Sequence, residues 1–490
     1  MPTVETDRDT FDRLASSAPT AARVPVAVRV TVEDPFTAYR RARDPVGGVY
    51  LATTGGQSGW GYFGTTPADF LEVGADDGET LAALGDLLGG ETLVRGDCSV
   101  PYPCGAIGWL SYDVARELET LPESAVADRA LPQLQVATYD RLAAWEEPRG
   151  DGPVTLTVTA CPRLDEYDSV ERAYEFGRQH ALELAREATE GDPGVEDPRV
   201  ETDAAEFESD CTRESFAERV RTVKRYIRDG DTFQANVSQR LSAPAAVHPV
   251  EAFDALRSVN PAPYSALVEF PGVDLVSASP ELLLHRDGDH LVTEPIAGTR
   301  PRGETSEADD RLEADLLADE KERAEHAMLV DLERNDLGKV SRFGTVEVID
   351  YRRVDRYSEV MHLVSEVEGR LRASATLEDA VAAVFPGGTI TGAPKPRTME
   401  IIDEVEETRR GPYTGSIGIF GFDGRATLNI VIRTLVRYGE EYHLRVGAGV
   451  VHDSDPDSEY DETLDKGRAL INAVDEALGR RADFSVEGTR

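Results

Sequence analysis

Alternation of apolar and polar residues marks the first strands of the chain. From Val24 to Val32 a valine occupies every second position, which is the period of a half-buried β-strand. The period changes to that of a helix at residues 169–187. Between these two segments, Gly and Pro separate four more short strand patterns, as is typical of an antiparallel sheet. These patterns lie at residues 48–53, 59–64, 105–112 and 154–160.

The second half of the chain mixes the two periods. A helical stripe begins near Ser215, where Glu218 completes a possible capping box, and it ends at Gly230. The following segment, 231–240, alternates between an apolar face and a face of amide, hydroxyl and guanidinium groups. Such a polar face indicates either a binding pocket or a solvated sheet edge.

A tight turn and a long helix follow these strands. The Asp287-Gly288 pair predicts a hairpin. The chain then enters a Gly-Thr turn at 298–299, and we expect one helix from about residue 306 to residue 336. Four segments around the hairpin have strand patterns, at 266–270, 275–279, 282–285 and 291–294.

These patterns together predict an α+β fold with large β-sheets and flanking helices. A length of 490 residues fits two or three units. The candidate linker is acidic, contains Gly and Pro, and has almost no large apolar residue. We therefore expect an N-terminal domain over 1–188, a linker over 189–210, a catalytic domain over 211–480 and a tail over 481–490.

Charge restricts the partners of the protein. The formal charge is −40, from 92 acidic and 52 basic residues, and phosphate-rich partners would be repelled. We therefore expect no nucleic acid and no membrane partner. The sequence contains no apolar run of the ~18 residues that a membrane span needs, and its acidic start is unlike a signal peptide. These features predict a cytoplasmic protein.

Arginine strongly outnumbers lysine among the basic residues, since only five are Lys. An acidic surface with few lysines indicates adaptation to concentrated salt, where the Debye length falls to ~3 Å at 1 M; an acidic protein of ordinary salinity is the alternative. The four cysteines have neither metal-site nor redox spacing, and none lies in a glutaminase-type nucleophile motif. They are Cys98, Cys104, Cys161 and Cys211.

Two pairs of carboxylates have helical spacing. Glu322 and Glu325 are three residues apart, and Glu459 and Glu462 repeat the spacing with Lys466 one turn further on. Two such helices would offer oxygen ligands to one hard cation, which suits Mg²⁺ better than zinc. In so acidic a chain, chance pairing is the alternative explanation.

The remaining candidate site residues are two segments of small residues, one arginine and one histidine. The segments 387–394 and 447–449 would let backbone N–H groups approach an anion, although the first is not a Walker A motif. Arg433 falls within an apolar run, 428–436, which predicts a strand and an ionic partner for the arginine. His362 lies in an apolar strand pattern and is either a core residue or an acid/base candidate.

In combination, these motifs resemble the chorismate-binding enzymes, and within that family they most resemble component I of anthranilate synthase. The resemblance covers residues 213 to 478, more than half of the chain. The motifs that carry it occur in family order at 230–240, 295–303, 325–332, 334–336, 387–394 and 447–466.

The resemblance implies a role for each matching residue. It implies that Mg²⁺, held by Glu325 and Glu462 with Glu459 close by, binds the ring carboxylate of chorismate. It implies that Glu322 protonates the leaving hydroxyl and that His362 takes part in pyruvate elimination. Substrate-contact positions implied in the same way are Gly298, Thr299, Thr389, Tyr413, Arg433, Gly447, Ala448, Gly449 and Lys466.

Two positions separate the members of the family. Gln234 stands where isochorismate and salicylate synthases place a lysine base, so the resemblance implies a nitrogen nucleophile instead of water. Ala297 stands where many aminodeoxychorismate synthases carry a lysine that bonds to the ring. Both residues favour anthranilate as the product, from chorismate and ammonia. Aminodeoxychorismate synthase component I is the alternative, and a non-catalytic protein that binds chorismate or tryptophan is a more remote one.

Ammonia and feedback inhibition are the remaining expectations. Because the chain has no glutaminase motif, the resemblance implies a separate glutamine amidotransferase subunit and therefore a hetero-oligomer. A regulatory tryptophan site in such enzymes has a Leu-Leu-Glu-Ser motif, but residues 50–53 here read Tyr-Leu-Ala-Thr. Pro263 and Tyr264 resemble the other wall of that site and are weak candidates for it.

Overall fold

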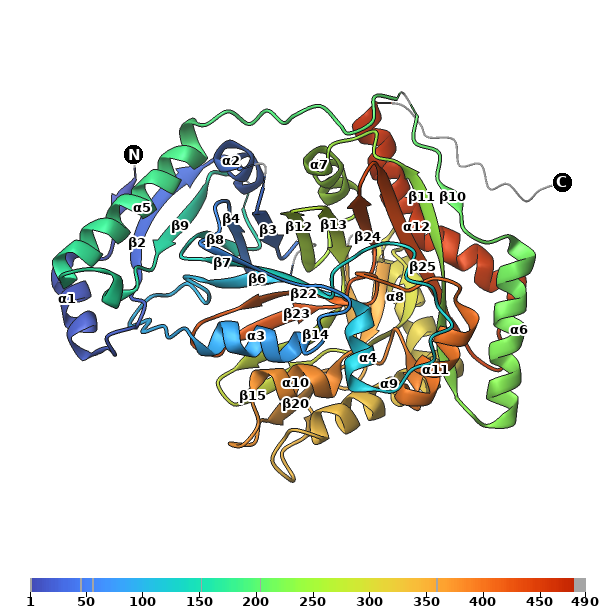
Figure 1. The fold of residues 1–490 in the computed structure, drawn as a ribbon. Coiled ribbons are helices and arrows are strands. Elements are labelled where there is room, and N and C mark those ends of the chain that lie inside the picture. Colours follow the sequence, from blue (N-terminus) through green and yellow to red (C-terminus); the bar gives the residue numbers. More distant parts are fainter. Residues whose placement is uncertain are drawn as a thin grey trace.

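A computed structural model describes residues 2–44, 46–54, 57–150, 152–202, 204–357 and 360–479. The described strands form three antiparallel sheets, and the large sheets with flanking helices confirm the predicted α+β class (Figure 1). The cluster of buried side chains between the two large sheets contains residues of both, so the sheets pack face to face.

The first sheet is the largest, with thirteen described strands. In spatial order they are β1 (Thr3–Val4), β2 (Val26–Val32), β9 (Val154–Ala160), β8 (Arg141–Glu147), β4 (Gly59–Gly64), β3 (Gly48–Ala52), β12 (Tyr264–Phe270), β13 (Val273–Ser279), β24 (Thr434–Tyr438), β25 (Glu441–Val450), β11 (Gln234–Pro244) and β10 (Glu208–Ser209). The short strand β21 (Gly392–Ala393) pairs with β11 beyond this order.

The second sheet has nine described strands and the third has three. The second runs β17 (Glu347–Val348), β20 (Val367–Arg370), β15 (His290–Thr293), β14 (Leu282–Asp287), β23 (Ala426–Asn429), β22 (Ser416–Phe420), β6 (Gly105–Leu110), β7 (Leu134–Tyr139) and β5 (Asp69–Val73). The third runs β16 (Ile296–Pro301), β19 (Val360–Val364) and β18 (Arg353–Arg356). The predicted hairpin at Asp287-Gly288 is confirmed, since it joins β14 to β15.

Helices cover the outer faces of both large sheets. Apolar residues of α2, α5, α7 and α12 pack on the first sheet, and those of α3, α9 and α10 pack on the second. The bounds of the α-helices are α1 (Arg8–Ser17), α2 (Pro35–Ala42), α3 (Thr80–Gly89), α4 (Ala115–Leu118), α5 (Val170–Glu190), α6 (Arg213–Asp229), α7 (Pro249–Val259), α8 (Ser306–Ala318), α9 (Glu320–Gly338), α10 (Leu377–Val384), α11 (Lys395–Val405) and α12 (Pro456–Leu478). Short 3₁₀ turns occur at Tyr112–Val114 and Leu164–Glu166.

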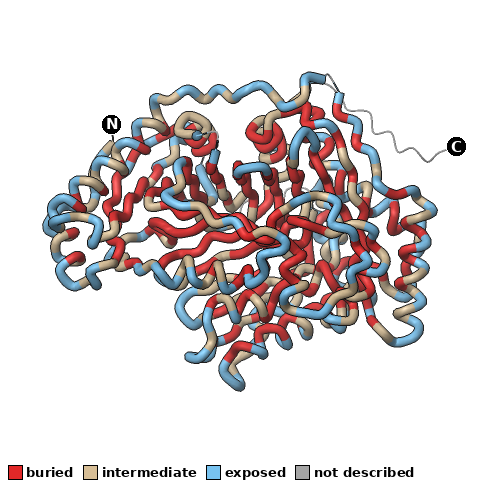
Figure 2. Tube along the Cα trace, viewed as in Figure 1, coloured by how far each residue is buried: buried red, intermediate tan, exposed pale blue. Residues whose placement is uncertain are grey.

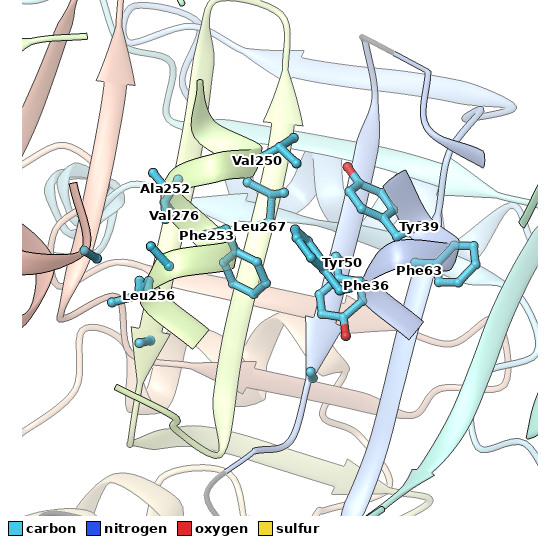
Figure 3. Packing of buried hydrophobic residues seen from close by; sticks show 14 of the residues in the cluster. Phe36, Tyr39, Tyr50, Phe63, Val250, Ala252, Phe253, Leu256, Leu267 and Val276 are labelled. Carbon is cyan, nitrogen blue, oxygen red and sulfur yellow. The ribbon is translucent and has the colours of Figure 1, made fainter. Parts of the chain in front are cut away.

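Aromatic packing holds α2 and α7 on the first sheet. Phe36 of α2 lies 5.1 Å from Tyr50 of β3 and 5.2 Å from Phe253 of α7, measured between ring centroids (Figure 3). All three side chains are almost fully buried, and aromatic pairs at this separation are worth about 0.5–1.5 kcal/mol beyond their buried area. These contacts join an N-terminal helix to a helix of the second half. The buried interior extends through both large sheets (Figure 2).

Both large sheets combine strands from before and after residue 188. In the first sheet β3 pairs with β12, and in the second β6 pairs with β22. The described residues between α5 and β10 form no regular element, and the segment runs over the molecule toward α6 (Figure 1). Ala205 and Phe207 of this segment are buried in the main core. The domain boundaries stay a prediction.

Three local expectations were wrong. The helix expected over 306–336 is interrupted at Asp319, whose carboxylate caps α9 by accepting from the backbone N–H groups of Lys321 and Glu322. The capping box expected at Ser215 is absent, because α6 starts earlier, at the N-cap Thr212. The strand expected over 428–436 is divided into β23 and β24.

Candidate active site

The paired strands β11 and β25 carry one side of the candidate site. In this ladder Asn236 lies opposite Gly449 and Ser238 lies opposite Gly447. A Cβ atom on Gly447 would lie 2.5 Å from the Asn236 Oδ1 atom and 2.6 Å from the Tyr413 hydroxyl, too close for any other residue. Glycine at 447 therefore keeps open the space between the polar face of β11 and Tyr413. The polar face predicted for segment 231–240 is buried here, so its solvated-edge interpretation is wrong.

Helix α9 meets this ladder through Gln234. Nε2 of Gln234 donates a 2.8 Å hydrogen bond to Oε1 of Glu325. A Cβ atom on Gly449 would lie 2.7 Å from the same Nε2 and 3.7 Å from that Oε1, so Gly449 borders the pair. Oε1 of Gln234 is buried and has no hydrogen-bond partner among the described residues. The structure thus brings together Gln234, Glu325 and Gly449, which are far apart in sequence.

The two predicted carboxylate pairs share one electrostatic environment. Burial raises the pKa of Glu325 and Glu459 above the ordinary glutamate value, and Glu322 and Glu462, respectively, raise them further. The charges of Lys321 and Lys466 act in the opposite direction on both carboxyls, which places α9 and α12 side by side. The charged forms of Glu325 and Glu459 are therefore only partly compensated by the two lysines.

Lys466 joins α12 to the β11–β25 ladder. Its Nζ atom lies 2.7 Å from Oε1 of Glu462 and donates a 3.0 Å hydrogen bond to the carbonyl of Gly447. In the part of the chain that the structure describes, no group of three or more His, Cys, Asp or Glu side chains surrounds a common metal position. Glu462 is engaged by the lysine instead.

The Gly-Thr turn of β16 faces the N-terminal end of α9. Gly298 has a φ of +79°, and a Cβ atom there would lie 3.0 Å from Oε2 of Glu322. Glycine is therefore required both by the left-handed backbone and by the proximity of the carboxylate. Arg300 of the same strand lies 3.4 Å from Oε1 of Glu322 and also binds Asp319, the cap of α9. These contacts fix Glu322 against the turn.

His362 lies beside the turn, directly across the β16–β19 ladder. Its Nδ1 atom lies 2.9 Å from Oγ1 of Thr299, its register partner, and its ring packs edge-on against Tyr357 at 5.5 Å. The other ring nitrogen, Nε2, is buried without a hydrogen-bond partner among the described residues. Burial and the neighbouring Arg433 lower the pKa of His362 to about 4, so its imidazole is neutral at physiological pH.

Arg433 occupies the break between β23 and β24. Its φ of +50° is unusual for a residue other than glycine, and the strand expected here was wrong because the chain turns at this residue. The guanidinium is half-buried next to Glu281 and Tyr357. Glu281 lies close enough for its charge to act on the pKa of Arg433, but the ionic partner predicted for Arg433 stays a prediction.

Glu281 is a buried carboxyl beside Arg433 that the sequence did not single out. It follows β13 in the sequence Ser-Pro-Glu, and its side chain is 5% exposed. Burial raises its pKa to about 8, although the Thr389 hydroxyl and the Arg433 charge favour the ionised form. A carboxyl with this pKa carries a proton at neutral pH. Neither charge patterning nor spacing marks a lone glutamate between strands, so the sequence offered no signal for it.

A second buried network supports the β11 strand and the Tyr413 turn. Both Nη2 of Arg410 and Nη1 of Arg445 bind the carboxylate of Glu406, at 2.8 and 3.1 Å. Glu406 also accepts from the backbone and hydroxyl of Ser238, and Arg410 stacks 5.6 Å from the Tyr413 ring. These interactions fix Tyr413 relative to the β11–β25 ladder. The spacing of the charged residues in the sequence did not predict this network.

The remaining predicted positions lie in the same region. Ala297 of β16 is 7% exposed and precedes the Gly298 turn, and Ala448 is fully buried between the two glycines of β25. Thr389 is placed by its contact with Glu281. The predicted catalytic, metal and specificity residues lie on β11, β16, β19, α9 and α12, and the substrate positions lie on β16, β25, α12 and the segments that precede β21, β22 and β24.

A separate cavity of about 460 Å³ lies between the two large sheets. Pro263 and Tyr264, the candidates for a tryptophan site, both line it, and so do the residues 51–53 of the altered motif. The Tyr264 hydroxyl donates a 3.3 Å hydrogen bond to Glu294, which in turn binds Arg353 at 2.6 Å. Glu294 lies three residues before Ala297, so the cavity is joined to the turn of the active site.

None of the described helices combines the length and apolar composition that crossing a bilayer requires. The cysteines are not paired in disulfides, and Cys104, Cys161 and Cys211 are buried. Burial raises the pKa of Cys161 and Cys211, which agrees with inert thiols.

A family model described as chorismate binding enzyme matches residues 82–472 of the chain. The chain belongs to the chorismate-binding enzyme family. The matched region begins well before Arg213, where the resemblance in the sequence started, because strands of the first half complete both sheets.

Individual chorismate-binding enzymes are similar over most of the chain. Anthranilate synthase component 1 1 of Haloarcula marismortui is 82% identical over 487 residues, 99% of each chain. Aminodeoxychorismate synthase component 1 of Bacillus subtilis is 43% identical over 372 residues, 76% of this chain and 77% of that protein. The crystal structure of anthranilate synthase component I from Streptococcus pneumoniae has a TM-score of 0.72 at 30% identity, covering 84% of this chain and 92% of that one.

Proposed function

We propose that this chorismate-binding enzyme is a lyase that converts chorismate and ammonia to anthranilate, pyruvate and water. The observation that carries the proposal is the neutral Gln234 amide bound to Glu325, beside a Gly-Thr turn in which the preceding residue is Ala297. Neither side chain can activate water or attack the ring, so the nucleophile is supplied as ammonia. The 82% identity to an anthranilate synthase component 1 over the full chain supports the same reaction.

The carboxylates of α9 and α12 fit a bound Mg²⁺ by their donor chemistry. They are oxygen ligands, burial disfavours the charged forms of Glu325 and Glu459, and the unpartnered Gln234 Oε1 lies beside Glu325. Glu325, Glu459 and Glu462 would hold the ion. When bound, it would neutralise the ring carboxylate of the substrate and polarise it. In the protein itself, Arg433 and the N–H groups of the 447–449 backbone would bind the enolpyruvyl carboxylate.

Two carboxyls can protonate the hydroxyl that leaves from C4. Glu322 is the one implied by the resemblance, and it lies against the Gly298 turn with Arg300 as a neighbour. Glu281 is the one that the structure adds, and its pKa of about 8 keeps a proton on it at neutral pH. We propose that Glu281 donates the proton and that Glu322, positioned by Arg300, orients ammonia at C2.

His362 would act in the second half of the reaction. Elimination of pyruvate from the aminated ring removes the proton at C2, and a neutral imidazole with a free Nε2 can accept it. The hydrogen bond to Thr299 fixes the ring orientation, and Tyr357 packs against its face. Protonated His362 would then be stabilised by the anionic product, which offsets the repulsion from Arg433.

Ammonia would reach this site from a glutamine amidotransferase subunit, which makes the working enzyme a hetero-oligomer. The chain would use free ammonium when the partner is absent, because the proposed chemistry needs only the nucleophile. A cytoplasmic location and adaptation to concentrated salt stay predictions that accompany this proposal, the second supported by the charge of −40.

The cavity between the sheets is proposed as the site of feedback inhibition by tryptophan. Its volume of about 460 Å³ and its apolar lining, with Trp60, Tyr62 and Tyr102, suit an aromatic amino acid. Glu294 lines the cavity and leads into β16, so occupancy can change the position of the Gly298 turn.

Product identification tests the proposal directly. The purified chain is incubated with chorismate, Mg²⁺ and ammonium in concentrated salt, and products are identified by fluorescence and mass. Anthranilate with an equal amount of pyruvate is the expected result. An aminated product that keeps its enolpyruvyl group would instead assign the chain to aminodeoxychorismate synthesis, and no consumption of chorismate would leave a binding protein.

A further inference from the structure

Arg129 and Arg409 face each other across a small cavity far from the carboxylates of the active site. The cavity has a volume of about 30 Å³, about the space of one water molecule or a monatomic ion. It lies between the loop 127–133, which precedes β7, and the turn 409–411, which follows α11. Gln133, whose Oε1 atom is buried without a hydrogen-bond partner among the described residues, lines it as well.

Each of the two guanidinium groups has a buried donor that the described residues around it leave without an acceptor. The Nε atoms of both are buried and have no hydrogen-bond partner in the part of the chain that the structure describes. The side chain of Arg129 is 9% exposed, and its nearest carboxylate oxygen, on Asp128, is 3.5 Å away. Buried guanidinium donors without acceptors cost free energy. Such an arrangement is unexpected in a chain with 92 acidic residues to pair with.

The carboxylates at the cavity are already engaged by other groups. Asp128 is bound by Arg240 at 2.7 Å. Asp113 accepts a 2.9 Å hydrogen bond from the backbone of Gly411 and lies 3.6 Å from Arg116. The cavity itself is lined by two arginines and two carboxylates, and both carboxylates also bind arginines outside it, so Arg129 and Arg409 share their negative charge with Arg116 and Arg240.

Two more arginines, Arg240 and Arg445, lie close enough to Arg129 to act on its pKa. Arg240 and Arg445 lie directly opposite each other in the β11–β25 ladder, where like charges are destabilising. Their charges and burial lower the pKa of Arg129 to about 10. Burial, Arg129 and Arg240 likewise lower the pKa of His443 to about 3, so this histidine adds no charge. Arg129 thus lies near several other arginines in a protein whose overall charge is strongly negative.

We infer that the cavity between Arg129 and Arg409 binds a single monatomic anion, chloride in the conditions of a saline cell. Both guanidinium groups would donate to it, and Gln133 would add a third donor once its amide is turned to present nitrogen. The ion would join the 127–133 loop to the turn that leads into Tyr413 through Gly411, whose φ is +62°. A weak site is sufficient, because the proposed environment is rich in salt.

Bromide provides the test in the crystal, since it substitutes for chloride and scatters anomalously. Crystals of the full chain, soaked in bromide, are expected to show an anomalous peak between the guanidinium groups of Arg129 and Arg409. Water alone at this position, with bromide peaks elsewhere on the surface, would overturn the assignment.

Thermal stability provides the test in solution. Chloride is titrated against glutamate, which is too large for the cavity, at constant sodium concentration. We expect a chloride-specific rise of melting temperature of about 2 °C that saturates in the native chain. The rise should be absent in Arg129→Gln and in Arg409→Gln, the second of which keeps the proposal testable if the first does not fold. Arg425→Gln, a half-buried arginine with ion pairs to Asp287 and Asp423, is the matched control and should keep the rise. An unchanged chloride response in both cavity variants would refute the site.

Discussion

Gln234 on strand β11 donates its amide hydrogen bond to Glu325 on helix α9, over 2.8 Å. The two residues are 91 positions apart, and each was assigned a different task, one in specificity and one in metal binding. In the proposed mechanism, their contact links the residue that selects the nucleophile to a ligand of the proposed Mg²⁺ site. The hydrogen bond lowers the pKa of Glu325 against the effect of burial.

Replacing Gln234 by Lys should therefore weaken Mg²⁺ binding as well as change the choice of nucleophile. A lysine ammonium at this position would pair with Glu325 and compete with Mg²⁺, so we expect the Mg²⁺ concentration for half-maximal rate to rise about tenfold. The measurement is the rate of ammonium-dependent anthranilate formation against Mg²⁺ concentration. Gln234→Met removes the hydrogen bond without adding charge and is the matched control, with a smaller effect expected. Equal Mg²⁺ dependence in the two variants would contradict the shared role.

Substitution of Glu281 separates the two candidates for the general acid. If Glu281 donates the proton, the native rate should fall above pH 8, because its pKa is about 8. The rate of Glu281→Gln should be lower than that of the native chain by a factor of about 10²–10⁴ at all pH values. Glu322→Gln should retain the alkaline limb near pH 8 at reduced rate. A pH profile of Glu322→Gln without this limb would instead assign the acid to Glu322.

The raised pKa of Glu281 also predicts how the stability of the folded protein depends on pH. A folded-state pKa of about 8 lies above the unfolded value of 4.5, so ionisation is disfavoured in the folded chain. The group therefore costs no stability below about pH 4.5, and the cost grows as pH rises to about 8. We expect Glu281→Gln to be more stable than the native chain at pH 9, by about a few kcal/mol, and equally stable at about pH 4. Denaturant unfolding at the two pH values measures this difference.

His362 should control the second step and leave the first intact. With its imidazole replaced in His362→Ala, the base for the C2 proton is missing, and the aminated intermediate is expected to accumulate. Mass spectrometry of quenched reactions would detect it with its enolpyruvyl group. Tyr357→Phe, which keeps the ring packing against His362, is the control and should accumulate none. Failure of both variants to consume chorismate would place His362 in substrate binding instead.

Filling the cavity between the sheets should remove inhibition by tryptophan without loss of catalysis. Thr53 is half-buried at the cavity, and a tryptophan side chain at this position would occupy part of its volume. We expect Thr53→Trp to raise the tryptophan concentration for half-inhibition at least tenfold in the ammonium-dependent assay. Thr155→Trp, at an exposed position of β9 outside the cavity, should respond like the native chain. Retained inhibition in Thr53→Trp would refute this location.

Local patterns predicted the elements of the chain well where one face was clearly apolar. The valine alternation gave β2, and the Asp-Gly pair gave the β14–β15 hairpin. Local patterns failed where a side chain forms hydrogen bonds with the backbone and interrupts a helix. Asp319 looks like one more acidic residue of a helix, but its contacts to backbone N–H groups and to Arg300 end one helix and start another.

The sequence by itself determined the class of fold, the carboxylate pairs at helical spacing, the small residues of the turns and, through its motifs, the family. These properties depend on residues that are close in the sequence, so the periodicity of apolar residues and the spacing of motifs reveal them. Tertiary structure alone decided that Gln234 binds Glu325, that Glu281 keeps its proton, and that Arg129 and Arg409 share a cavity. A pKa depends on desolvation and on charges brought close by folding, and neither of these is recorded in the order of residues.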